Sequence, residues 1–454
     1  MPTPNDTTTY ADTGHTPVTA GQLLRTKRIW VVPVILASLF MGLVSVIYIG
    51  SVINPTGHLH GLPVMLVNED SGASVHGRTI DVGASIANGL EQSAGVTSRL
   101  KLEPASLAQA EATMNTGHAY AALVIPATLS RSVLLAAGVE SPGSGPPGEA
   151  TIALKENSRL GSLGVNLAAG VVTPAIEQIS PRVGSQLSSL ATPAAQGNPL
   201  LADRLANPVT VKTSAYRQLP DHSALGLSAF YIALLSILSG FIGATLVNSS
   251  IDSALGYATT ELGPHWKQKR PAAISRRQTF LTKWATAALA VPILTGILLL
   301  IAVVALGMYA PHVFLLWLLC AFASLMIATA TLALVATFGS IGQLIAMLLL
   351  VYLSLASSGG TVPIQALPGV FNVVGHVEPL RQVLGGTRAI LYFGAKGDAG
   401  LTHAFVIIGA ELLFWAAIGL AVTSWYDRRG LDRISPATQQ VIERAIAQST
   451  EGRS

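Results

Sequence analysis

Glu411 is the residue best placed for chemistry, because it interrupts the long apolar segment 404–425. An acidic residue at the centre of a membrane-spanning helix costs about 2.5–3.5 kcal/mol, so its carboxylate should face protein or water and not lipid. One interpretation makes Glu411 a contact for a substrate or a proton. The other makes it a structural partner of a Ser, Thr or His side chain nearby, and His403, two turns away, is a candidate.

A second group of charges lies in the segment 357–403, just before that apolar run. It contains Glu378 and Arg381 together with the amphipathic run Val370–Val374. The segment is too polar to span a membrane, which predicts one or two short helices at the outer surface or dipping partly into the membrane. An ordinary external loop is the alternative. With Glu411, Glu378 and Arg381 are the residues that we expect along a substrate path.

Motifs for catalysis or cofactor binding are absent. The sequence has no GxxxxGK[ST], HExxH or GxSxG. A literal GxGxxG at 143–148 contains two prolines and is interpreted as a flexible loop. The turn Asn68–Ser71 has oxygen ligands for a cation, although a polar turn after a strand accounts for it without a metal. We therefore expect no catalytic residue, no metal and no cofactor, and a protein that is not an enzyme.

Composition places the chain among membrane proteins. Charged residues make up 11% of it, against roughly 25% in soluble domains, while apolar residues reach 50% and the mean hydropathy is +0.53. The net charge of +4 does not indicate nucleic-acid binding, because basic cytoplasmic loops produce the same excess. The single cysteine, Cys320, excludes an intramolecular disulfide and a cysteine zinc cluster.

Long apolar segments predict the fold class. A bilayer core of about 30 Å needs ~20 apolar residues per helix, and the segments that qualify are 29–53, 225–247, 284–306, 313–338, 341–356 and 404–425. The third to fifth fill 284–356, and a tight hairpin around Gly339 and Gly342 should join the fourth to the fifth. The predicted fold is an α-helical polytopic membrane protein with six transmembrane helices, one before and five after a mixed α/β insert at 54–222.

Orientation follows from the distribution of Lys and Arg, which favours the cytoplasmic side. Basic residues flank the membrane segments in the tail 1–28, the loop 248–283 and the tail 426–454. Both termini are therefore predicted to be cytoplasmic in a multi-pass protein of the plasma membrane. The insert 54–222 and the loop 357–403 are then extracytoplasmic.

The insert has the pattern of a mixed α/β domain. Apolar runs predict strands at Leu62–Val67, Tyr120–Ile125 and Thr151–Leu154. Between the first two, apolar residues spaced by three and four predict one helix from Ile80, and Ser106 with Gln109 forms a capping box for a second helix. From 160 to about 205, an Ala- and Ser-rich stretch with several prolines predicts broken helices.

Four segments resemble the phage infection protein (YhgE/Pip) family: LPVMLVNEDSGA (62–73), AYAALVIPATLS (119–130), IALKENS (152–158) and the re-entry into the membrane at 207–238. Many members of that family carry a longer, coiled-coil-like insert, which this chain lacks. The resemblance implies the membrane architecture of ABC-2 type permeases.

The same resemblance implies a function. The chain would be the permease subunit of an exporter that moves a hydrophobic or amphipathic molecule outward, powered by a separate ATPase. The alternative is a non-transporting scaffold or receptor whose external domain binds a secretion component or a phage. By analogy with ABC-2 permeases, 251–262 is the expected ATPase-docking element, with Leu255 and Tyr257 as its main residues. The basic residues that follow are expected to contact anionic membrane lipid.

Oligomerisation is expected from the same analogy, because six helices resemble half of a transporter. We expect a homodimer or a heterodimer with a homologous permease. Ser236, Gly240 and Ala244 place small side chains on one face of the second helix, which allows close helix approach. That face fits either an intramolecular contact or the dimer interface.

Overall fold

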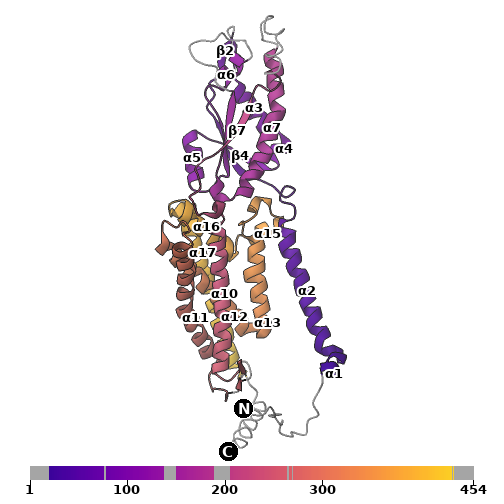
Figure 1. The fold of residues 1–454 in the computed structure, drawn as a ribbon, viewed down its shortest axis with the longest axis vertical. Helices are drawn as coiled ribbons and strands as arrows, with labels where there is room; N and C mark the ends of the chain where they lie inside the picture. The colour runs from indigo at the N-terminus through magenta and orange to yellow at the C-terminus, as the bar shows by residue number, and fades with distance from the viewer. Residues whose placement is uncertain are drawn as a thin grey trace, which may run out of the picture.

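The computed structural model describes residues 20–75, 78–136, 150–188, 205–262, 265–267, 269–431 and 433. It is mostly helical, with an α/β domain stacked end to end on a helical bundle (Figure 1). We call the bundle end that contacts this domain the domain end and the opposite one the far end. The predicted loop at 143–148, most of the tail 1–28 and most of the tail 426–454 lie outside the described residues.

Among the described residues, the bundle contains six helices that are long and apolar enough to cross a membrane, which indicates a multi-pass membrane protein and confirms the six predicted apolar segments. They begin at α2 (Lys27–Val52), α10 (Ser228–Ala254), α11 (Arg276–Leu299), α12 (Val313–Phe338), α13 (Ser340–Ala346) and α17 (Thr402–Arg428). Three of these helices continue or are preceded by short helical segments: the π-helical η3 (Leu300–Ala305) extends α11, η4 (Met347–Leu353) and α14 (Ser354–Ser357) extend α13, and η6 (Gly397–Leu401) precedes α17. The short α1 (Ala20–Arg25) precedes α2. Helices α10 and α11 extend beyond the predicted boundaries, so the loop predicted at 248–283 is shorter and part of it is helical.

Helix α12 is the centre of the bundle and contacts α10, α11, α13, α16 and α17. Its contact with α10 uses the small residues noted in the sequence. The Ser324 hydroxyl of α12 donates to the Ser236 carbonyl of α10 at 2.7 Å, and a Cβ atom at Gly240 would collide with the Ser324 carbonyl. The small-residue face therefore forms an intramolecular helix contact, which decides between the two alternatives.

The connection from α12 to α13 is the tight hairpin predicted around Gly339 and Gly342. Gly339 has a φ of +63°, which side chains rarely adopt. A Cβ atom at Gly342 would collide with the Leu334 carbonyl. Both glycines are thus required for the two helices to turn back on each other within one residue.

Helix α2 lies at the edge of the bundle (Figure 1). It contacts the other helices mainly through η4 and α14, where the rings of Phe40 and Tyr352 meet edge to face at 6.2 Å. Most of its apolar side chains are exposed. In a membrane these side chains would face lipid.

The α/β domain is built on a five-stranded sheet of order β4-β1-β5-β6-β7. The strands are β1 (Leu62–Asn68), β4 (Leu100–Pro104), β5 (Ala121–Ile125), β6 (Thr151–Glu156) and β7 (Thr210–Ala215), with a separate hairpin of β2 (Ala73–Val75) and β3 (Arg78–Ile80). Only the β5–β6 pair of the main sheet is antiparallel. The three predicted strands are confirmed, whereas β4, β7 and the hairpin were not predicted.

Successive side chains of the central strands point to opposite faces of the sheet, so they contribute to two separate buried layers. Leu62, Val64 and Leu66 of β1 join a core with α3 (Val82–Gln92), α4 (Ala94–Thr97), α6 (Leu129–Ala136) and α7 (Ser162–Ser188), while Met65 and Val67 pack toward α5 (Leu107–Asn115). The predicted capping box of Ser106 and Gln109 begins α5. The sheet therefore lies between two helical layers.

Helix α7 corrects the prediction of broken helices after residue 160. The short turn η1 (Ser158–Leu160) precedes it, and α7 then runs as one helix through Pro174 and Pro181. Proline normally breaks a helix interior, but Val172 and Ile176 are buried against the sheet. Tertiary packing holds the helix together across both prolines.

The segment between α14 and α17 is built of short helices, as predicted: η5 (Ile364–Ala366), α15 (Gly369–Val374) and α16 (Pro379–Tyr392). Val362, Ala366 and Leu367 enter the core of the α/β domain. Helix α16 packs against α10, α12 and α17. The segment is therefore not an ordinary loop, because it joins the domain to the bundle.

The expected docking element at 251–262 is helical only at its start. Helix α10 ends at Ala254, and Gly256 has a φ of +77°, the left-handed conformation in which helices commonly end. A short hairpin follows, of β8 (Thr260–Leu262) and β9 (His265–Lys267). The glycine, present in the sequence, was the signal for this helix end.

Candidate functional site

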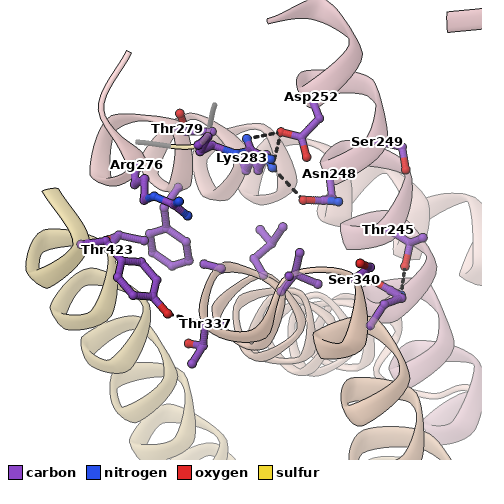
Figure 2. Close-up of a pocket in the computed structure, with 18 residues that line it drawn as sticks. Thr245, Asn248, Ser249, Asp252, Arg276, Thr279, Lys283, Thr337, Ser340 and Thr423 are labelled. Carbon is purple, nitrogen blue, oxygen red and sulfur yellow. Dashed lines mark hydrogen bonds and ion pairs between the residues drawn. The ribbon is translucent and has the colours of Figure 1, made fainter. Parts of the chain in front are cut away.

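A cavity of about 660 Å³ opens at the far end of the bundle (Figure 2). Its wall comes from α10, α11, α12, α13 and α17, and polar side chains are numerous: Thr245, Asn248, Ser249, Asp252, Arg276, Thr279, Lys283, Thr337, Ser340, Gln343, Thr423, Tyr426 and Arg433. Such a cavity can hold water or the polar part of a ligand inside an otherwise apolar bundle.

An ion-pair cluster forms one wall of this far-end cavity. Lys283 Nζ lies 2.7 Å from Asp252 Oδ1 and donates to Asn248 Oδ1 at 2.7 Å (Figure 2). Arg433 also pairs with the Asp252 carboxylate. The sequence placed Lys283 in a loop at 248–283. The structure corrects this, because Lys283 lies inside α11 and pairs with a carboxylate on α10.

The mouth of the far-end cavity is organised by Asp427 near the end of α17. Its two carboxylate oxygens accept hydrogen bonds from the backbone N–H groups of Arg276 and Arg277, so α17 caps the N-terminus of α11. The Arg276 guanidinium lies 5.0 Å from the centre of the Tyr426 ring. Arg276, expected at lipid headgroups, therefore makes intramolecular contacts, whereas Arg277 is exposed.

The predicted docking residues lie just outside this mouth. The Tyr257 hydroxyl donates to the Ala272 carbonyl at 2.7 Å, and the Arg433 guanidinium lies 4.4 Å from the centre of its ring. Leu255 is partly exposed. Tyr257, which is also partly exposed, thus supports the loop fold.

A second cavity, of about 510 Å³, lies at the domain end. Its lining is mostly apolar and comes from η4, the segment that enters α16, and α17: Leu349, Leu350, Leu353, Val374, His376, Val377, Glu378, Pro379, Ile407, Ala410, Glu411, Phe414 and Trp415. Two residues predicted from the sequence, Glu378 and Glu411, therefore line one cavity. We call it the carboxylate cavity.

Glu411 has no hydrogen-bond partner for either carboxylate oxygen among the described residues. His403 does not supply one, because it lines a different cavity. The expected pairing of Glu411 with His403 is therefore not present. An acidic side chain without a partner among the described residues is costly in an apolar wall.

Glu378 is 4% exposed and immediately precedes α16, where Pro379 takes the first helical position. No hydrogen bond of normal geometry reaches either of its carboxylate oxygens within the described chain. Burial, together with the charge of Glu411, raises the pKa of the Glu378 carboxyl well above its usual range. The nearby backbone N–H groups of Arg381 and Leu380 and the Arg381 charge oppose this shift.

Arg381, the third predicted residue, lies in a neighbouring cavity of about 350 Å³ between the α/β domain and the bundle. Arg388 and Tyr120 line the same cavity. Burial lowers the pKa of both guanidinium groups and raises the pKa of the Tyr120 hydroxyl. The structure thus brings Glu378 and Glu411 together and places Arg381 next to them, in a separate cavity.

The polar turn Asn68–Ser71, considered as a cation site, has a structural role. The Asp70 carboxylate accepts hydrogen bonds from the Gly83 N–H at 2.9 Å and from the Ser130 N–H at 3.1 Å, and the Ser130 hydroxyl donates to it as well. It therefore joins β1 to the starts of α3 and α6. Within the described ranges, no three His, Cys, Asp or Glu residues lie close enough to hold a metal ion.

The chain matches the family described as "Protein of unknown function (DUF3533)" over residues 32–410. This match covers most of the 454 residues. The chain belongs to the DUF3533 family. No curated protein matches it.

The DUF3533 match includes the α/β domain, Glu378 and the Asp252–Lys283 pair, and it ends one residue before Glu411. The sequence reasoning missed the Asp252–Lys283 pair. A signal was available, since Lys283 lies immediately before the apolar segment 284–306 and Asp252 lies just after the apolar segment 225–247. Two opposite charges next to neighbouring spans predict an ion pair inside a bundle.

Proposed function

We propose that this DUF3533 protein is the permease subunit of an exporter that moves a hydrophobic or amphipathic molecule outward, with a separate ATPase as its energy source. The observation that carries the proposal is that α17 and the α13–η4 helix line both cavities, the far-end one and the carboxylate cavity. Glu411 and Thr423, one in each lining, are about 18 Å apart along α17 at ~1.5 Å per residue. A rearrangement of these two helices would open one cavity as it closes the other.

The proposed orientation has one span before and five after the α/β domain, with that domain outside the plasma membrane. The Lys and Arg distribution supports it. The far-end cavity then faces the cytoplasm, and the carboxylate cavity lies toward the external leaflet. Their linings fit this order, because the first is rich in polar side chains and the second in apolar ones.

The ATPase would bind at the far end, against the loop between α10 and α11. Leu255 is the main docking candidate, and Tyr257 stabilises the loop that presents it. Exposed Lys269, Arg270 and Arg277 would contact anionic headgroups. A homodimer or a heterodimer with a homologous permease completes the proposed transporter, and its interface is not the Gly240 face, because α12 covers that face.

The test is purification of the full-length protein from its native membranes after mild cross-linking, with identification of bound subunits and measurement of ATP hydrolysis. We expect an ATPase subunit to co-purify, Leu255→Asp to release it and Ala273→Ser, at an exposed position of the same loop, to retain it. Absence of any ATPase from the wild-type complex would contradict the mechanism. Recovery of an extracytoplasmic partner in its place would favour the scaffold or receptor alternative.

A further inference from the structure

The carboxylate cavity combines three features that no structural role explains together. Its wall includes two carboxylates, Glu378 and Glu411, whose four oxygens are buried and lack partners among the described residues. Its other lining is almost entirely aliphatic and aromatic. At its rim, Phe414 is 57% exposed and Val377 is 73% exposed, so a molecule dissolved in the surrounding lipid could enter from the side.

We propose that the carboxylate cavity binds a cation with a large apolar body, such as a quaternary ammonium or phosphonium compound, with Glu378 and Glu411 as its counter-charges. The inference rests on the proposed function and names the class of its substrate. Even a single ionised carboxylate in the wall of an apolar cavity attracts a cation strongly, because its charge is weakly screened there. The apolar walls then bind the body of the same molecule.

Aromatic side chains strengthen this assignment. Phe414 and Trp415, which follow Glu411 on α17 and share the lining with it, have ring centroids 5.3 Å apart in an edge-to-face arrangement. The faces of aromatic rings attract cations, and quaternary ammonium groups are commonly bound in this way. A carboxylate beside two aromatic rings is thus a suitable site for a positive group that cannot donate hydrogen bonds.

Other ligands fit the cavity less well. An anion would be repelled by both carboxylates. A small inorganic cation requires several oxygen ligands, whereas only Glu378 and Glu411 supply side-chain oxygens to the described lining. A neutral lipid tail would fit the walls but would supply no counter-charge to either carboxylate.

Protonation should compete with the cation. The other ionisable groups near the pair are His376, which lines the cavity before α16, and Arg381, which acts on Glu378 from α16. The η4 wall contributes only leucines. Because a protonated carboxyl no longer attracts a cation, affinity should fall as the pH is lowered.

The experiment measures binding of two probes to purified full-length protein in nanodiscs. Tetraphenylphosphonium and tetraphenylborate have the same size and shape and opposite charge. We expect saturable binding of tetraphenylphosphonium that weakens at lower pH, and no saturable binding of tetraphenylborate. This comparison uses only the wild-type protein, so it does not depend on the folding of any variant. Equal binding of both probes, or saturable binding of neither, would overturn the proposal.

Variants then assign the site. Glu411→Gln and Glu378→Gln keep the side-chain shape and should each weaken tetraphenylphosphonium binding by about tenfold, the effect of one lost charge contact of ~1.4 kcal/mol. Asp398→Asn removes an exposed carboxylate in η6, outside the lining, and should leave binding unchanged. Unchanged affinity in both glutamate variants would place the cation elsewhere and overturn the assignment.

This binding assay needs neither the ATPase nor transport, so the two proposals can fail separately. If the protein binds the cation but exports nothing in cells, the proposed ligand class stands and the proposed exporter function is wrong. If the protein exports other amphiphiles but does not bind tetraphenylphosphonium, the proposed exporter function stands and the proposed cation site is wrong.

Discussion

Asp252 of α10 and Lys283 of α11 form an ion pair of 2.7 Å whose side chains are only 12% and 9% exposed. The pair joins two candidate membrane helices on either side of the loop proposed to bind the ATPase. It also forms part of the wall of the far-end cavity. A rearrangement that moves α10 away from α11 would have to stretch the contact between the two residues.

The first prediction concerns the strength of that pair. Asp252→Asn leaves the Lys283 ammonium and the Arg433 guanidinium without their counter-charge, which for a buried pair costs about 3–5 kcal/mol. We expect a clear decrease of the melting temperature in detergent. Glu103→Gln is the matched control, because the Lys101–Glu103 pair has the same 2.7 Å separation but side-chain exposures of 68% and 37%. Its effect should be about 0–1 kcal/mol, and equal shifts in the two variants would refute this account of the cluster.

The second prediction concerns the contact between α10 and α12. Gly240→Ala places a methyl group against the Ser324 carbonyl, and overpacking of this kind costs about 1–3 kcal/mol. Thermal unfolding monitored by circular dichroism should therefore begin at a lower temperature. Gly42→Ala in α2 meets no atom within 4 Å and should leave the melting temperature unchanged. A Gly240→Ala protein as stable as the wild type would show that the helices are further apart than described.

The third prediction concerns the α/β domain. Asp70→Asn weakens three hydrogen bonds that join β1 to α3 and α6, and hydrogen bonds to a charged group contribute about 1.5–3 kcal/mol each. Amide hydrogen exchange at Gly83 and Ser130 should become faster. The neighbouring Glu69→Gln variant changes an exposed side chain and serves as the control. Unchanged exchange at both amides in Asp70→Asn would argue against this structural role.

Much of the architecture could be predicted from the sequence, because the membrane spans and the buried strands are continuous apolar runs. The end strands were missed for a physical reason. Lys101 and Glu103 give β4 the polar character of a loop, and Thr210–Ala215 forms an exposed strand at the edge of the sheet. Pro174 and Pro181 wrongly predicted helix breaks, since local propensity does not include the packing of α7 on the sheet.

The candidate site was predictable only in part. An acidic residue in an apolar run is conspicuous, so Glu411 could be found from the sequence alone. That Glu378 faces the same cavity depends on how the segment before α16 folds back against α17, which no local pattern encodes. The Asp252–Lys283 pair similarly depends on the packing of α10 against α11.

The fourth prediction tests the orientation of the chain. The only native cysteine, Cys320, is buried in α12, so single introduced cysteines can be labelled with little background. Cysteines at the exposed positions Lys101 and Asp398 should react with an impermeant thiol reagent in intact cells. A cysteine at exposed Ala273, in the loop between α10 and α11, should react only after the membrane is permeabilised. Labelling of Ala273→Cys in intact cells would reverse or refute the proposed topology.

The most direct test of the account is ATP-dependent uptake into everted membrane vesicles that contain the protein and its native membrane partners. The substrates are tetraphenylphosphonium, tetraphenylborate and a neutral fluorescent lipid, so that export is measured for each charge class. We predict ATP-dependent accumulation of tetraphenylphosphonium, lost in Glu411→Gln and retained in Asp398→Asn. Accumulation of tetraphenylborate or the neutral lipid in place of tetraphenylphosphonium would support the exporter function and contradict the proposed substrate class. Uptake equal to that of vesicles lacking the protein, for every substrate and with ATP present, would contradict the central claim that this DUF3533 protein is an exporter permease.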